Sequence, residues 1–414
     1  MGSPAPGGRR DRWPERHVAS GKAGHGAEKC RADRREIVKM PSVGPRWACS
    51  FFFAVVGIVY GSVMSRMPAI KAQAALSDAD VGVMLLCMGL GGLVSFPLAG
   101  WAISRTSCRR VLTLVSAALM LLFPCMGLTS GFLSACVLFA LLGFAIGLND
   151  VGINAGSILV ETFMHRAVIS SMHALYSLGG LLGALAGSCM AALNVTPLGH
   201  FSAVACILAC LLPFFAAQLL QDAPRPGPKN GRLTHPPLWV LIFGLLMLCS
   251  YSSEGSVGEW GVLLLHEVKG ASEQTAALAY AAFSVAMVVM RFFGDRLREH
   301  FGDARLLRVC SGCALAGMIL ALLSPWPLVC LVGYAFMGLG LSVSVPILFS
   351  AAGRRKDLPT GTVTAFLSML AASGQLFIPP LIGMLGAVVG LQAAMSVVVL
   401  LCAVLFLGAG IVRR

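Results

Sequence analysis

Hydrophobic and polar positions form long blocks along this chain. After Trp47, apolar runs close to the roughly 20 residues that cross a bilayer as a helix recur to the end, separated by short polar or Gly/Pro-containing breaks. Because the backbone in lipid must satisfy its own hydrogen bonds, each run is predicted to be an α-helix. We expect twelve spans, at about residues 47–66, 79–101, 111–129, 132–160, 167–193, 199–220, 237–266, 274–296, 305–323, 326–349, 361–386 and 388–411.

Composition agrees with lipid as the main solvent. Of the 414 residues, 57% are hydrophobic and 12% are charged, and the mean hydropathy is +0.82. A water-soluble globular domain of this length does not have such a composition. The sequence therefore predicts an all-α, multi-pass membrane protein.

The basic residues indicate the orientation of the chain. Of the 31 lysines and arginines, 28 fall in the termini and alternate loops, and only Arg66, Lys71 and Lys269 fall in the other loops. By the positive-inside rule, we expect both termini in the cytoplasm and the chain in the inner (plasma) membrane. This distribution also argues against a nucleic-acid partner, in spite of the formal net charge of +13.

A long polar break divides the chain into two parts with six spans each. Residues 222–236 are expected to be a cytoplasmic linker between bundles at 47–221 and 237–414. Residues 1–46 are expected to be a disordered basic cytoplasmic tail. Met40 stands just before the first span and is an alternative translation start.

Two corresponding loops resemble a family signature. The first loop reads Gly100-Trp-Ala-Ile-Ser-Arg-Thr-Ser-Cys-Arg-Arg110. The second stands about half a chain length later and reads Gly294-Asp295-Arg296-Leu, followed by Gly302 and further basic residues. The second loop is similar to the signature loop of the major facilitator superfamily. The resemblance implies two pseudo-symmetric six-helix bundles and a conformational role for Gly294, Asp295 and Arg296. In the first loop, Ser104 stands where the family usually has an Asp.

The fourth and fifth spans resemble the fucose-permease branch of that superfamily. The segments are Leu148-Asn-Asp-Val-Gly-Ile-Asn and Met172-His-Ala-Leu-Tyr-Ser-Leu-Gly. The resemblance implies that Asp150, Asn154 and His173 line a central cavity. The acid that the fucose permease carries in its first helix has no counterpart here, so the substrate does not follow from the resemblance.

Acids inside a span need a partner, a proton or a water-filled cavity, because an ionised side chain at mid-membrane costs roughly 3 kcal/mol or more. Asp150 and Asn154 are four residues apart, and Glu161 continues the same helix face. Asp150 is the first candidate for the coupling proton, with a structural hydrogen bond as the alternative. Glu161 is expected to form a gate or a loop salt bridge. His173 is expected to bind substrate or titrate with Asp150, with helix packing as the alternative.

The seventh span combines acids with glycines. Gly255 and Gly258 beside Glu254 and Glu259 favour a broken helix at a binding site. Glu254 is the second candidate for proton coupling, and Glu259 is expected near the outer surface as a gating residue. Trp260 is expected to stack on substrate or to anchor at the membrane interface.

Two residues of the first span complete the candidate site. Tyr60 is expected to line the cavity. Arg66 is expected to be an outer gate or an interface residue.

Other chemistries receive no support from the sequence. No Gly-rich phosphate loop ending in Lys-Ser or Lys-Thr is present, so an ion gradient, not ATP, is expected to drive transport. We expect no enzyme activity, no cofactor and no metal. The 14 cysteines fall almost entirely inside predicted spans, and Cys310 and Cys313 have no further ligands nearby.

These observations predict a secondary transporter that works by alternating access. It is expected to move a small polar solute, such as a sugar, together with protons, and to act as a monomer. The alternatives are a proton-driven exporter of small metabolites or drugs, and a membrane sensor that does not transport.

Overall fold

The spans predicted from the sequence are present as helices. The computed structural model describes Gly2 and residues 44–76, 78–222, 236–271, 273–355 and 357–413. Within these ranges, twelve helices are long and apolar enough to cross a membrane. They are α2 (Gly44–Ser65), α4 (Asp78–Arg105), α5 (Cys108–Cys125), α6 (Phe132–Met164), α7 (Ile169–Ala192), α8 (Pro197–Ala217), α9 (Leu238–Leu263), α10 (Glu273–Phe301), α11 (Asp303–Leu323), α12 (Pro327–Leu341) with α13 (Ser344–Gly353), α14 (Thr360–Val389), and α15 (Leu391–Ala394) with α16 (Ser396–Gly408). The remaining elements are short: α3 (Met67–Gln73), η1 (Met126–Leu128), η2 (Leu264–Val268) and η3 (Ala409–Arg413).

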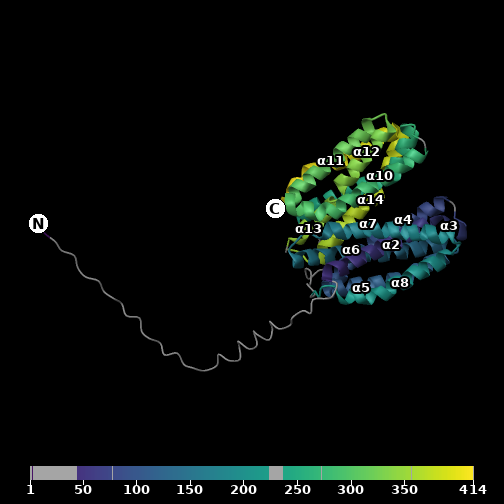
Figure 1. Ribbon diagram of the computed structural model, residues 1–414, viewed down its shortest axis with the longest axis horizontal. Helices are drawn as coiled ribbons and strands as arrows, with labels where there is room; N and C mark the ends of the chain where they lie inside the picture. The colour runs from purple at the N-terminus through teal and green to yellow at the C-terminus, as the bar shows by residue number, and fades with distance from the viewer. Residues whose placement is uncertain are drawn as a thin grey trace, which may run out of the picture. The chain divides into compact units, whose positions relative to one another are not determined.

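Residues 43–414 form one compact unit that consists of two six-helix halves. In the first half α2 packs along α7, and α4 packs along α6. In the second half α9 packs along α14, and α12 packs between α10 and α11. The halves meet where α4 contacts α14 and where α7 contacts α10 (Figure 1). Most of the predicted tail and nearly all of the predicted linker lie outside the described residues.

Glycines bring α2 and α7 into close contact. A Cβ atom on Gly179 or Gly183 would lie only 2.4 or 2.3 Å from a backbone carbonyl oxygen of α2. Gly57 and Gly61 of α2 are equally close to carbonyl oxygens of α7. Small residues are the usual means by which membrane helices approach closely. The first half therefore contains a helix pair packed so closely at these glycines that no larger side chain fits between the backbones.

The tenth and seventh spans each contain an irregular segment. The tenth span is interrupted at Ser342 and Val343, between α12 and α13. The expected break at Gly255 and Gly258 in the seventh span is wrong. Helix α9 is continuous through both glycines because each packs against a neighbour, the side chains of Gln375 and Tyr280 respectively. The irregular turn is the π-helical segment η2, which begins four residues after Trp260, the last predicted site residue of this helix.

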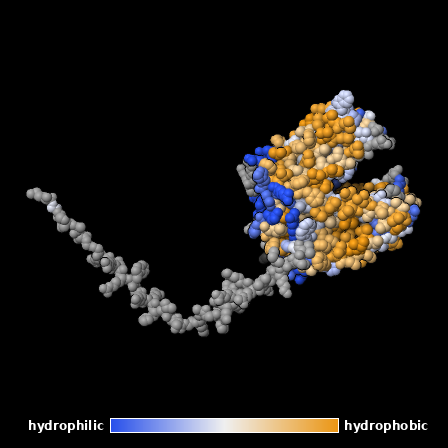
Figure 2. Space-filling model, in the orientation of Figure 1, coloured by the Kyte–Doolittle hydropathy of each residue, from blue (hydrophilic) through white to orange (hydrophobic). Residues whose placement is uncertain are grey.

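The two ends of the helical unit differ in polarity. The surface is largely apolar around the helices, and hydrophilic residues gather at one end, near α13 (Figure 2). At this end α6 and α10 finish and α7 and α11 begin. We call it the basic end because the loops and helix ends there carry basic residues of the sequence. The opposite end, which carries α3, is called the open end because the surface is hollowed there between the halves (Figure 2). An apolar perimeter is what a lipid-embedded protein requires.

Candidate functional site

Three of the predicted residues meet near the middle of the first half. The amide nitrogen of Asn154 donates to Oδ1 of Asp150 at 3.1 Å, and the amide oxygen lies 3.2 Å from Nε2 of His173. The two α6 residues are one helical turn apart, and His173 comes from α7. Because the amide already donates to the carboxylate, its oxygen is left to accept from the ring, which places the proton on Nε2. The structure thus places these three predicted residues in one hydrogen-bonded group.

Aromatic rings hold His173 in place. Its imidazole centroid lies 4.9 Å from the ring of Phe53 in α2 and 6.5 Å from the ring of Phe349 in α13. His173 is 7% exposed and Asn154 is fully buried. Since Phe349 belongs to the second half, residues of both halves surround this histidine. A carboxylate, an amide and an imidazole in series can bind hydroxyl groups and hold or pass a proton.

Arg291 connects the first half to the predicted acid of α9. Its Nη1 donates to Oγ of Ser177 at 2.7 Å, and its Nη2 lies 3.8 Å from Oε2 of Glu254. Arg291 was counted among the basic loop residues of the sequence, but it lies buried inside α10. Helix α10 places Arg291, Asp295 and Arg298 at positions i, i+4 and i+7, so all three lie on one helix face. That spacing was the signal available in the sequence.

Tyrosines surround this group. Tyr176 and Tyr251 lie within electrostatic range of Asp150, Glu254 and Arg291. A further interaction connects Tyr280 with Glu254 and Arg291. The predicted cavity residue Tyr60 interacts in turn with Tyr280, and its side chain is partly open to solvent. Four of the five tyrosines of the chain thus lie within electrostatic range of these charged groups or of one another.

The other predicted residues of α9 lie differently from one another. Glu259 is exposed. The indole nitrogen of Trp260 donates to the carbonyl oxygen of Pro379 at 2.9 Å, and the ring covers Gly383. Both contacts lie in α14, so Trp260 joins two helices of the second half.

Arg66 makes its hydrogen bonds inside the first half. Its Nη1 and Nη2 donate to the carbonyl oxygens of Gly187 and Val195 at 3.3 and 2.6 Å. It is 5% exposed and tethers the end of the first span to the end of α7. This geometry favours a packing role over the expected outer gate.

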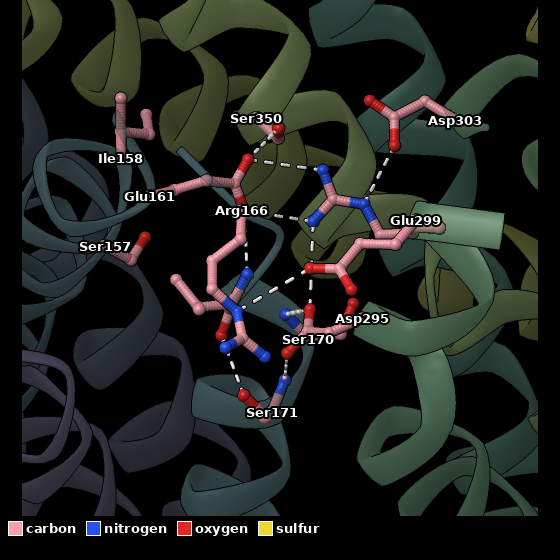
Figure 3. A network of polar contacts seen from close by, with 12 residues as sticks. Ser157, Ile158, Glu161, Arg166, Ser170, Ser171, Asp295, Glu299, Asp303 and Ser350 are labelled. Carbon is pink, nitrogen blue, oxygen red and sulfur yellow. Dashed lines mark hydrogen bonds and ion pairs between the residues drawn. The ribbon is translucent and has the colours of Figure 1, made fainter. Parts of the chain in front are cut away.

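The basic end is closed by a cluster of ion pairs between the halves (Figure 3). Arg298 of α10 donates through Nη1 to Oε2 of Glu161 in α6 at 3.2 Å, and through Nε to Oδ1 of Asp303 at 2.9 Å. Ser350 of α13 also donates to Glu161. Arg354 pairs with Asp303 at 2.8 Å. We call Glu161, Arg298, Asp303, Ser350 and Arg354 the basic-end lock. The sequence anticipated only Glu161 among them.

A helix N-terminus of the first half is capped by an acid of the second half. Both carboxylate oxygens of Asp295 accept hydrogen bonds, each 2.9 Å long, from the backbone N–H groups of Ser170 and Ser171. These residues form the first turn of α7, where the helix dipole favours a negative charge. Gly294 makes the approach possible, because a Cβ there would lie 2.9 Å from Cβ of Ser170. Arg296 is exposed beside this contact.

The first-half copy of this loop has no comparable acid. Oγ of Ser104 donates to the carbonyl oxygen of Trp101 in its own helix at 2.8 Å. Helix α14, which contacts α4, begins after Pro359 without a side-chain cap among the described residues. The charged contacts between the halves at the basic end therefore come mainly from α10, on one side of the pseudo-symmetric pair.

Comparisons with known proteins agree with this fold. The family model for the Major Facilitator Superfamily matches residues 47–358. The chain belongs to this superfamily of membrane transporters. It is 30% identical to an uncharacterized MFS-type transporter from Yersinia pestis, over 87% of this chain and 94% of the relative. It is 31% identical to the membrane protein MosC from Rhizobium meliloti, over 85% of this chain and 86% of that protein.

Among solved structures, the fold resembles a sugar transporter. The E. coli fucose:proton symporter FucP matches with a TM-score of 0.72 and 14% identity, over 89% of this chain and 98% of that chain. A structure of FucP in the outward conformation matches with a TM-score of 0.74. The expected resemblance to the fucose-permease branch is confirmed at the level of the fold.

Proposed function

We propose that this protein is a proton-coupled secondary transporter that carries a small polar solute across the inner membrane by alternating access. One observation carries the proposal. The polar region around Asp150, Asn154 and His173 lies between a lock that closes the basic end and a hollow at the opposite end. A central site closed at one end and open at the other is what alternating access requires.

The positive-inside pattern supports an orientation for this conformation. With the basic end in the cytoplasm, the hollow faces outward and the lock prevents release to the inside. Solute and proton would enter from the outside, and separation of Arg298 from Glu161 would open the inner side. The twelve spans of the described residues place both ends of the helical unit on the same side, so both termini would then be cytoplasmic.

Asp150 and Glu254 are the proposed proton carriers. Each is an acid inside a span, next to hydrogen-bonding groups and within the polar region shared by the halves. A carboxylate there is costly when ionised without a partner, so movement of the halves can change its proton affinity. Asn154, His173 and Tyr60 are proposed to contact the solute. Trp260 is proposed to position α14 beside them.

Transport in vesicles tests this proposal. Purified protein in lightly buffered proteoliposomes should acidify the lumen when a transported solute is added outside, and the solute should accumulate under an imposed inward proton gradient. Extrusion of preloaded solute under the same gradient would instead identify an exporter, the second candidate function that this geometry serves. Solute movement that ignores the proton gradient in both directions would refute proton coupling.

A further inference from the structure

We infer that the transported solute is a hydroxylated carboxylic acid, whose carboxylate binds Arg291 when a proton displaces Glu254 from that arginine. This inference rests on the proposed proton-coupled transport and adds the chemical class of the solute. It comes from the incomplete bonding of Arg291, a residue that neither the comparisons nor the sequence analysis assigns to the site.

Arg291 is deeply buried but incompletely paired. It is 7% exposed, and its Nε is buried without a hydrogen-bond partner. Its Nη1 donates to Ser177. A guanidinium has five N–H donors arranged to bind the two oxygens of a carboxylate, and an unsatisfied buried charge is costly. Arg291 therefore has donors available in a region where a ligand carboxylate would satisfy them.

Glu254 is a loose and movable partner. Its Oε2 lies 3.8 Å from Nη2 of Arg291, beyond hydrogen-bond distance, and its side chain is 31% exposed. While the site is empty, such a pair neutralises the charge of the arginine, but it does not fix the orientation of the guanidinium. A solute carboxylate with bidentate geometry would compete well for the same guanidinium once Glu254 is protonated.

Charge conservation gives the stoichiometry of this exchange. The empty pair, ionised Glu254 with Arg291, is neutral. The loaded set, protonated Glu254 with Arg291 and a carboxylate, is neutral too. One proton therefore accompanies each carboxylate and no net charge moves at this pair, which keeps an uncompensated charge out of the membrane interior. A neutral sugar with a protonated Glu254 would leave Arg291 without a counter-charge.

Other groups around the pair suit a hydroxylated solute. Among the described residues, the titratable groups within electrostatic range of Glu254 or Arg291 are Tyr176 and His173 from α7, Tyr251 from α9 and Tyr280 from α10, and Asp150 of α6 is within the same range of Tyr176 and Tyr251. Phenol, imidazole and carboxylate groups donate to or accept from hydroxyls. A second proton on Asp150 would make transport electrogenic, so the dependence on membrane potential separates the two stoichiometries.

Binding and uptake of matched solute pairs test the inference. The probes are D-gluconate with D-glucose and D-galactonate with D-galactose, measured on the purified full-length protein and in proteoliposomes. The acids should bind and the neutral sugars should not. Because one proton binds with each acid, the Kd of the acid should fall up to about tenfold per pH unit between pH 8 and 5.5. Glu254→Gln should remove this pH dependence.

Variants at Arg291 give the second arm. Arg291→Gln should reduce acid binding at least tenfold, Arg291→Lys should retain part of it, and the control Arg110→Gln, at an exposed arginine, should leave it unchanged. Proton-coupled uptake of the neutral sugars alone would overturn the inference and leave the proposed function intact. Acid binding that depends on Arg291 but moves no protons would refute the proposed coupling and keep the solute class. If neither acid binds or is taken up, the inference is overturned.

Discussion

Arg298 and Glu161 form a hydrogen-bonded ion pair between the two halves of the protein. Nη1 and Nη2 of the arginine lie 3.2 and 3.3 Å from the two carboxylate oxygens, so the contact is bidentate. The arginine side chain is 2% exposed and the carboxylate 15%. Bidentate, buried charge pairs are geometrically specific and costly to break at one side only. This pair is therefore a specific contact between the halves at the closed basic end.

Removal of the charge at Glu161 should open the basic end. Glu161→Gln leaves Arg298 with one acid fewer, which we expect to cost the closed conformation about 1–3 kcal/mol and shift the equilibrium toward the open basic end by roughly 5- to 150-fold. Spin labels at Thr162→Cys and His300→Cys, exposed positions in opposite halves, would report a longer distance. Glu299→Gln is the control, because its ion pair with Arg166 is half-exposed. An unchanged distance distribution would contradict the lock.

A methyl group on Gly294 should weaken the cap on α7. Alanine favours a helix by about 1 kcal/mol over glycine, so any loss reflects the contact with Ser170 and not helix propensity. We expect Gly294→Ala to push Asp295 away from α7 and to lower the transport rate several-fold. The control is Gly92→Ala, whose Cβ would meet its nearest neighbour at an ordinary 3.6 Å. Equal rates for both variants would show that the close approach is unimportant.

Trp260 separates a packing role from substrate stacking. Trp260→Phe keeps an aromatic ring but removes the hydrogen bond to Pro379, which we expect to cost about 1 kcal/mol and to lower the apparent unfolding temperature by roughly 2 °C. Solute affinity should change less than twofold. Thermal unfolding and equilibrium binding of the same samples measure both quantities. A large loss of affinity at unchanged stability would restore the stacking role.

The fold was predictable because lipid constrains it strongly. Apolar runs of the required length have one backbone solution, and the second signature loop, at Gly294, indicated the family. Helix ends were less predictable: the fourth span was expected to end near residue 160, but α6 continues to Met164. The polar residue Glu161 near that end is stabilised by Arg298, a long-range partner that the apolar pattern does not contain.

The site was predictable only where its residues share a helix. Asp150 and Asn154 are one turn apart, and the fucose-permease resemblance added His173. Arg291 was overlooked because arginine near the end of a span is usually a loop charge, whereas here it is neutralised by Glu254 from another helix. The break expected at Gly255 failed for a related reason, since a tertiary contact with Gln375 supports the helix there.

The proton-coupling role of Asp150 is tested most directly by the luminal pH of proteoliposomes after addition of a transported solute. The account predicts that the unmodified protein acidifies the lumen and that Asp150→Asn moves fewer protons per solute while solute binding persists. Asp357→Asn, at an exposed aspartate of the basic end, should behave like the unmodified protein. An unchanged number of protons per solute in Asp150→Asn would contradict the account.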